Sequence, residues 1–217
     1  MKLKGIKINF LGDSITEGHG TSEVTKRFTD ILAREEEIIA FNYGISGTRI
    51  ALQKNPSENP RHDLDFCSRV AELEPSADMV VVFGGTNDYG HGDAPIGNFN
   101  DRTNETFYGA LHVLYRSLIE KFPEKPIVVL TPLHRLNELD KKGDAKKAEV
   151  ATLAEYVEII REVAEYYSLP VLDLFKTSGL QPDVDIIREN FMPDGLHPND
   201  AGHKILAQKI GTFLKSL

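Results

Sequence analysis

The five residues 79–83, Met-Val-Val-Val-Phe, constrain the fold of this 217-residue chain more than any other segment. A strand with one face in water alternates apolar and polar residues, whereas this segment is apolar throughout, as in a parallel sheet that helices cover on both faces. Four further stretches are apolar, rich in β-branched residues and of strand length: residues 6–10, 38–43, 127–130 and 171–174. The chain is therefore predicted to form five strands.

Segments with helical periodicity lie between these strands. Apolar residues recur at helical spacing at Phe107, Leu111, Leu114 and Leu118, and again at Val150, Leu153, Val157, Ile160 and Ala164. A final helix is expected over residues 199–214, with Pro198 in its first turn. Alternating strands and helices indicate parallel βαβ units and an α/β fold, a three-layer α/β/α sandwich, so residues 1–217 are predicted to form a single domain.

Three long irregular segments follow the carboxyl ends of predicted strands: residues 89–106, 132–147 and 176–193. Open α/β sheets bind ligands at that edge, and loops of this length in a compact domain are usually functional. We expect them to form the walls of a substrate pocket. Within and after the first loop, Tyr89, Phe99 and Phe107 would either stack on a substrate or pin the loop to the core.

Composition narrows the classes of partner. A formal charge of -8 and a pI near 5.4 argue against a protein that binds nucleic acid through its phosphates. No apolar run approaches the ~20 residues of a membrane-spanning helix. Residues 1–10 intersperse lysines with apolar residues and lack the apolar core of a secretory signal, so a cytoplasmic location is expected. Cys67 is the only cysteine, which excludes an intrachain disulfide. The expected partner is a small molecule.

Four short polar segments, far apart in the chain, fall where strands or loops end. They are residues 12–15 (Gly-Asp-Ser-Ile), 44–47 (Gly-Ile-Ser-Gly), 84–88 (Gly-Gly-Thr-Asn-Asp) and 194–197 (Asp-Gly-Leu-His). Strand ends converge on one crevice in an α/β domain, so these segments are expected to meet. Together they contain the groups that an acyl-transfer site needs.

Ser14, directly after the first strand, is the candidate nucleophile. A serine needs a base to remove its proton and a third group to orient that base, and His197 with Asp194, three residues apart in a tight turn, suits both roles. In the alternative, Ser14 caps the helix that follows it, while Asp194 and His197 only shape a turn and cap the last helix. Thr21 and Ser22 are better placed to cap the next predicted helix, which leaves Ser14 free.

Acyl transfer also requires donors aimed at the oxygen where negative charge develops. The candidates are the backbone amides of Ser14 and Gly47 and the side-chain amide of Asn87. Alternatively, Gly47 only permits a turn with positive φ, and Asn87 and Asp88 only form a turn. A nucleophile, a base, an orienting carboxylate and amide donors all fall on the same sheet edge, which favours one site over several coincidences.

Other polar residues near these segments have simpler roles. Glu17 and Arg49 lie within three residues of a polar segment, so either could contact a polar substrate, but a solvated surface position is the default expectation for both. The Asp13 side chain is expected to fix the turn at Ser14 by accepting hydrogen bonds from backbone amides. Four histidines lack the acidic or cysteine partners of a metal-ligand motif, so surface or pocket-lining roles are favoured and no metal is expected: His19, His91, His134 and His203.

The four polar segments, in this order, resemble the conserved blocks of SGNH hydrolases, also called GDSL esterases. The resemblance spans nearly the whole chain, and Ile15 replaces only the leucine of the family's shorter name. It implies a flavodoxin-like five-stranded parallel sheet of order 2-1-3-4-5 and an ester hydrolase that uses neither metal nor cofactor. It further implies a Ser14-His197-Asp194 triad, with Ser14, Gly47 and Asn87 as the oxyanion hole. The Gly-x-Ser-x-Gly elbow of an α/β-hydrolase is absent.

The predicted function is therefore a serine ester hydrolase that acts on a small acyl ester. O-deacetylation of a carbohydrate is the preferred reaction, from the resemblance and from the polar residues 97–102, which could hydrogen-bond hydroxyl groups. The alternatives are a lysophospholipase or thioesterase, an acyltransferase with the same triad, and a non-catalytic module that binds a small molecule.

Overall fold

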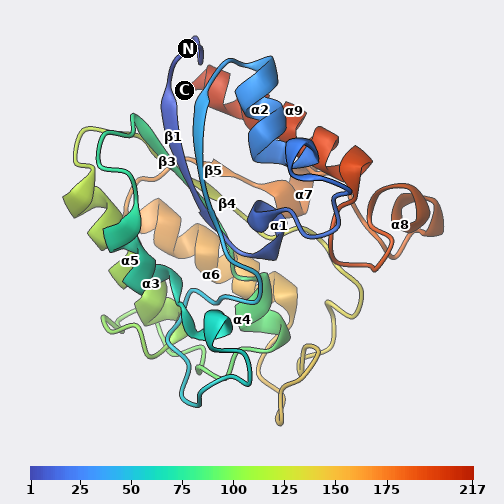
Figure 1. Ribbon diagram of the computed structural model, residues 1–217. Helices are drawn as coiled ribbons and strands as arrows, with labels where there is room; N and C mark the ends of the chain where they lie inside the picture. The colour runs from blue at the N-terminus through green and yellow to red at the C-terminus, as the bar shows by residue number, and fades with distance from the viewer.

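The computed structural model describes residues 1–217 and contains one five-stranded parallel sheet in the order β2-β1-β3-β4-β5 (Figure 1). The strands are β1 (Lys7–Gly12), β2 (Ile39–Gly44), β3 (Met79–Phe83), β4 (Ile127–Leu130) and β5 (Val171–Leu172). Fold class, strand number and strand order agree with the sequence prediction. The fifth strand is shorter than expected because Asp173 caps helix α7 (Leu174–Thr177) by accepting a hydrogen bond from the Lys176 amide.

Two apolar cores lie on opposite faces of the sheet, and the central strand β3 contributes to both. Val80 and Val82 belong to the core under α3 (Phe66–Arg69), α5 (Phe107–Lys121) and α6 (Leu153–Tyr166). Met79, Val81 and Phe83 belong to the core under α2 (Phe28–Glu35) and α9 (Asp200–Ser216). Figure 1 shows these two groups of helices on either side of the strands. The uninterrupted apolar character of residues 79–83 follows from this burial on both faces.

Capping side chains set where the long helices begin. Helix α6 starts at Leu153 because Thr152 and Glu155 form a reciprocal capping box, which leaves Val150 outside the helix. Helix α9 starts at Asp200, since the Asn199 side chain accepts hydrogen bonds from the amides of the next turn. The prediction that Pro198 occupies the first turn of the last helix is therefore wrong.

The start of α2 also differs from the prediction, because neither Thr21 nor Ser22 caps it. A short 3-10 turn, η1 (Val24–Lys26), intervenes, and the Ser22 side chain instead donates to Asp200. The Phe28 amide donates to Nδ1 of His203 on α9, at 3.2 Å. His203 is fully buried, so a surface or pocket-lining role for it is wrong.

Because His203 accepts the Phe28 amide only when its ring is neutral, we expect the stability of the protein to depend on pH. Burial lowers the pKa of His203 from 6.5 to about 4, and only neutral Nδ1 accepts the Phe28 amide. The unfolded chain therefore binds a proton at pH values where the folded chain does not, so this contribution is present above pH 6.5 and is lost as the pH falls towards 4. Urea unfolding should show the free energy of unfolding falling by on the order of 1 kcal/mol per pH unit in this window. In His203→Gln, which does not titrate, the slope should be smaller, and equal slopes would contradict the assignment.

The remaining helices are short and lie mainly near the carboxyl ends of the strands: α1 (Ser14–Glu17), η2 (Pro60–Asp63), η3 (Val70–Glu72), α4 (Thr86–Gly90) and α8 (Asp185–Phe191). Helices α1 and α4 directly follow β1 and β3, which are neighbours in the sheet. Two predicted site residues, Ser14 and Asn87, therefore lie on adjacent strand ends. None of the helices is both long and apolar enough to cross a membrane.

Candidate active site

The Gly-Asp-Ser turn places Ser14 at the start of α1. Strand β1 ends at Gly12, where a Cβ atom would lie 2.0 Å from Oγ1 of Thr16, so this close turn requires glycine. Asp13 Oδ1 accepts a hydrogen bond from the Ile15 amide at 3.1 Å, which confirms its expected role in fixing the turn. Burial raises the pKa of Asp13 to about 6. With Asp13 as the cap of α1, the Ser14 hydroxyl is available for another partner.

That partner is His197, from the loop before α9. Nε2 of His197 lies 3.0 Å from Oγ of Ser14, and Nδ1 of His197 lies 2.6 Å from Oδ2 of Asp194. The other carboxylate oxygen, Oδ1 of Asp194, accepts the amides of Leu196 and His197 at 2.9 and 2.7 Å. Asp194 thus shapes its own turn and also contacts the imidazole, whereas the cap of α9 is Asn199.

The same hydrogen bonds determine the charge on Asp194. Burial alone would raise its pKa, but the bonds from the His197 ring and from the two backbone amides outweigh burial and hold the pKa of Asp194 well below its usual range. The carboxylate is therefore ionised over the whole range in which a histidine titrates. An ionised carboxylate at Nδ1 favours the tautomer whose Nε2 can accept a proton from a serine hydroxyl.

Gly47 and Asn87 follow β2 and β3, the two strands that flank β1 in the sheet. Gly47 has φ +77°, and a Cβ atom there would lie 2.3 Å from the His62 ring, so both backbone angle and space require glycine. Its N–H donates to no acceptor within the protein. Nδ2 of Asn87 donates one hydrogen to the carbonyl oxygen of Thr48 at 3.0 Å, which leaves its second hydrogen available. Gly47 and Asn87 thus shape their turns and still have an N–H each that can donate to a ligand.

Two charged residues that were expected on the surface instead hold these segments together. The Glu17 carboxylate accepts the Ser46 amide at 2.7 Å, which ties α1 to the segment after β2. Arg49 is only 3% exposed, and its Nη1 donates to the Gly47 carbonyl at 3.2 Å and to Nδ1 of His91 at 3.3 Å. The default expectation of a solvated surface charge is thus wrong for Arg49.

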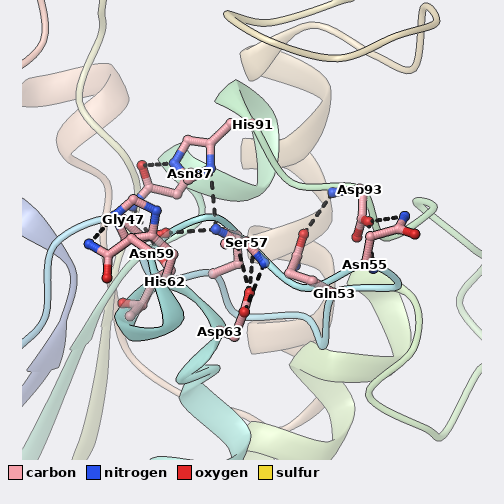
Figure 2. A network of polar contacts seen from close by, with 12 residues as sticks. Gly47, Gln53, Asn55, Ser57, Asn59, His62, Asp63, Asn87, His91 and Asp93 are labelled. Atoms are coloured by element: carbon pink, nitrogen blue, oxygen red, sulfur yellow. Dashed lines mark hydrogen bonds and ion pairs between the residues drawn. The ribbon is translucent and has the colours of Figure 1, made fainter.

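Like the contacts of Arg49, the contact of His91 with Asn87 was not predicted from the sequence. Its Nε2 lies 3.1 Å from Oδ1 of Asn87, and Figure 2 shows the two side chains pointing towards each other. A signal for this contact was present, because His91 comes four residues after Asn87, a spacing that places two side chains on the same side of a helical turn. The corresponding signal for Arg49 was its position two residues after Gly47.

Comparison with known proteins identifies the family. Residues 10–205 match the model of the GDSL-like lipase/acylhydrolase family. The chain belongs to this family. A solved structure from Lactobacillus plantarum is 30% identical, with a TM-score of 0.82 over 98% of each chain. No curated protein matches the chain.

More distant structures share the GDSL-family fold. A possible lipase from Chitinophaga pinensis is 21% identical, with a TM-score of 0.67 over 97% of this chain and 98% of its own. A two-domain esterase active on acetylated mannans is 20% identical, with a TM-score of 0.67 over 98% of this chain and 49% of its own. This GDSL-family chain thus has the family's α/β/α architecture along nearly its whole length.

A cavity of 510 Å³ is lined in part by Arg49 and by His91, the residue that contacts Asn87, but none of Ser14, Asn87 and His197 lines it. Two of the three predicted loops contribute to its wall, through residues 91–95 and 145–147, but residues 176–193 do not. Residues 53–57, from the loop after β2, were not predicted and form another part of the wall. Eight of the lining residues are polar or charged: Arg49, Gln53, Asn55, Ser57, His91, Asp93, Lys146 and Lys147.

The polar residues 97–102, which could hydrogen-bond the hydroxyl groups of a substrate, do not line this cavity. Phe99 packs between α5 and α6, against the rings of Tyr108 and Tyr166. Tyr89 and Phe107 are both buried in the core. Of the two roles considered for these aromatic residues, the structure supports pinning the loop to the core.

One group of side chains in the GDSL-family site has the composition of a metal-binding cluster. Ligand atoms of His19, Asp194 and His197 lie within 4.8 Å of one another, and the His19 ring centroid is 4.2 Å from that of His197. Both ring nitrogens of His197 already have partners, Ser14 and Asp194. A cation bound to His197 would displace one of them, so these residues can complete a triad or hold a metal ion, but not both at once.

Proposed function

We propose that this GDSL-family protein is a serine ester hydrolase in which Ser14 is the nucleophile, His197 the general base and Asp194 the group that orients it, with residues 1–217 forming one catalytic domain. The observation that carries the proposal is the continuous contact from Oγ of Ser14 to Nε2 of His197, at 3.0 Å, and from Nδ1 of His197 to Asp194, at 2.6 Å. These are the two contacts that an activated serine requires.

The mechanism follows from the atoms in contact. His197 Nε2 takes the proton of Ser14 as Oγ attacks the ester carbonyl, and the resulting oxyanion is bound by the N–H groups of Ser14 and Gly47 and by Nδ2 of Asn87. The tetrahedral intermediate expels the alcohol, which receives the proton from His197. Water, deprotonated by His197, then attacks the acyl-serine, and the acid leaves as Ser14 Oγ regains its proton.

The preferred substrate is an O-acetyl group on a carbohydrate. Only four of the 15 residues that line the cavity next to His91 are hydrophobic, which favours a hydroxylated substrate over a long acyl chain. One structural neighbour is an esterase active on acetylated mannans, which gives a concrete substrate to try. A lysophospholipase or thioesterase would require a more apolar lining, and an acyltransferase would pass the same acyl group to an alcohol instead of water.

A hydrolysis panel tests the proposal. Wild type and Ser14→Ala should be compared on acetyl, butyryl and octanoyl aryl esters and on acetylated mannan oligosaccharides, with an alcohol added in one arm to detect transfer. The expected result is Ser14-dependent hydrolysis that is fastest for acetyl esters and releases acetate from the sugars. Preference for octanoyl esters would refute the deacetylase assignment alone, whereas equal rates for the two proteins would refute the triad.

A further inference from the structure

The side chain of Asn87 can serve an oxyanion only in one of its two orientations. Its oxygen and nitrogen ends have nearly the same shape, but only Nδ2 donates hydrogen bonds. If the amide were rotated by 180°, it would present an acceptor to the developing negative charge. The neighbours that distinguish the two ends of the amide therefore decide whether the site has this donor.

The first neighbour that distinguishes the two ends of the Asn87 amide is the carbonyl oxygen of Thr48. The Thr48 carbonyl oxygen, 3.0 Å from Nδ2 of Asn87, can only accept a hydrogen bond. The opposite end of the amide, Oδ1, lies 3.1 Å from Nε2 of His91. This contact favours the same orientation only if Nε2 of His91 carries a hydrogen, so the tautomer of His91 matters.

Arg49 determines that tautomer. Every N–H of a guanidinium is a donor, so the contact of 3.3 Å between Nη1 of Arg49 and Nδ1 of His91 requires a lone pair on Nδ1. A neutral imidazole with a lone pair on Nδ1 carries its hydrogen on Nε2, which then donates to Oδ1 of Asn87. Burial and the guanidinium of Arg49 lower the pKa of His91 to about 4, so the ring is neutral at ordinary pH.

The loop after β2 holds Arg49 in place. Nη2 of Arg49 donates to Oγ of Ser57 at 2.9 Å and to Oδ1 of Asp63 at 3.3 Å, and the Ser57 hydroxyl also donates to Asp63 at 2.7 Å. Figure 2 shows Ser57 and Asp63 beneath His91, with Gly47 to one side. Since Nη1 also donates to the Gly47 carbonyl, one buried guanidinium contacts both Gly47 and His91, the residue that contacts Asn87.

We propose that Arg49 and His91 are positioning residues that, through the hydrogen bonds Arg49 to His91 and His91 to Asn87, hold the Asn87 amide with Nδ2 towards the oxyanion. The proposal rests on the proposed function, because it assigns these residues to the same acyl-transfer site. Neither residue contacts the Ser14, His197 and Asp194 side chains by a hydrogen bond, so their effect is expected on transition-state stabilisation and not on proton transfer.

The first test replaces His91 while preserving its size or its hydrogen bonds. His91→Phe retains a ring but loses both bonds, and kcat for acetyl ester hydrolysis should fall about 3- to 10-fold with KM nearly unchanged, as expected for one lost neutral hydrogen bond. His91→Gln, which can donate to Oδ1 of Asn87, should recover most of the loss. His134→Phe is the matched control, because its ring nitrogen contacts Glu138 and not Asn87.

The decisive test is a double-mutant cycle with Asn87. If His91 acts through the amide, His91→Phe should lower kcat by less than about twofold in an Asn87→Ala background, because coupled residues are not additive. A loss that is as large in that background as in wild type would overturn the proposal, as would unchanged kcat in His91→Phe. Thermal unfolding of each variant identifies any that does not fold; if His91→Phe does not fold, His91→Ala, which also loses both hydrogen bonds, and its double mutant with Asn87→Ala supply the cycle.

These outcomes are distinct from failure of the proposed function. If wild type and Ser14→Ala hydrolyse esters at equal rates, the triad is refuted and the proposal for His91 falls with it. If hydrolysis depends on Ser14 but not on His91, only the positioning role is refuted.

Discussion

Replacing His197 with alanine is expected to lower kcat for ester hydrolysis by about 10⁴-fold or more, because Ser14 then has no base to accept its proton. The 3.0 Å contact between Nε2 of His197 and Oγ of Ser14 is the only hydrogen bond between the hydroxyl and another side chain. The double variant Ser14→Ala/His197→Ala should be no slower than the slower single variant, since residues that act as a unit are not additive.

The measurement is kcat and KM on an aryl acetate, with circular dichroism and thermal unfolding to verify the fold. His134→Ala is a matched control, since it also removes a loop imidazole but leaves the contacts of Ser14 intact. Activity of His197→Ala within tenfold of wild type would exclude His197 as the base. A residual rate shared by both single variants would instead reflect binding and oxyanion donors, which remain in place.

Replacing Asn87 with alanine is expected to lower kcat by about 10²-fold to 10³-fold with little change in KM, the usual loss for one oxyanion donor. The effect falls on kcat because the donor is used fully only when negative charge has developed on the carbonyl oxygen. Asn87→Asp is the informative companion variant. It preserves the shape of the side chain and an acceptor for His91, but presents an acceptor where the amide had a donor.

Both Asn87 variants are therefore expected to be slow, and Asn87→Asp should not be rescued by its better fit. Recovery of activity in Asn87→Asp would show that shape, and not a donated hydrogen bond, is what the site needs from residue 87. A rise in KM with unchanged kcat would place Asn87 in substrate binding. Thermal unfolding must accompany both variants, because Asn87 is buried and its amide also contacts Thr48.

Much of the fold could be predicted because its signals are local. Continuous apolar character marks residues 79–83 as a strand buried on both faces, and the structure buries all five. The errors occur where a distant segment supplies the partner. The amide of Phe28 is capped by His203, 175 residues away, so local reasoning about Thr21 and Ser22 chose the wrong cap.

In the candidate site, too, the residues that lie in local motifs could be predicted, whereas those nominated by composition could not be placed. Ser14, Gly47, Asn87, Asp194 and His197 could all be nominated because each lies in a short motif at the end of a strand or loop. The polar residues 97–102 were nominated by their composition, and they do not line the cavity. Polar composition indicates that a segment can form hydrogen bonds. Which ligand or residue the segment contacts depends on the path of the backbone.

By itself, the sequence determined the five parallel strands, their flanking helices and the residues that meet at the strand ends, because hydrophobic period and turn motifs are properties of adjacent residues. Only the tertiary structure decided the hydrogen bonds of residues outside these motifs. Arg49 became a buried contact of His91, 42 residues away, and the tautomer of His91 followed from that contact. Such hydrogen bonds depend on distances and directions between segments that the fold brings together, and no local pattern specifies them.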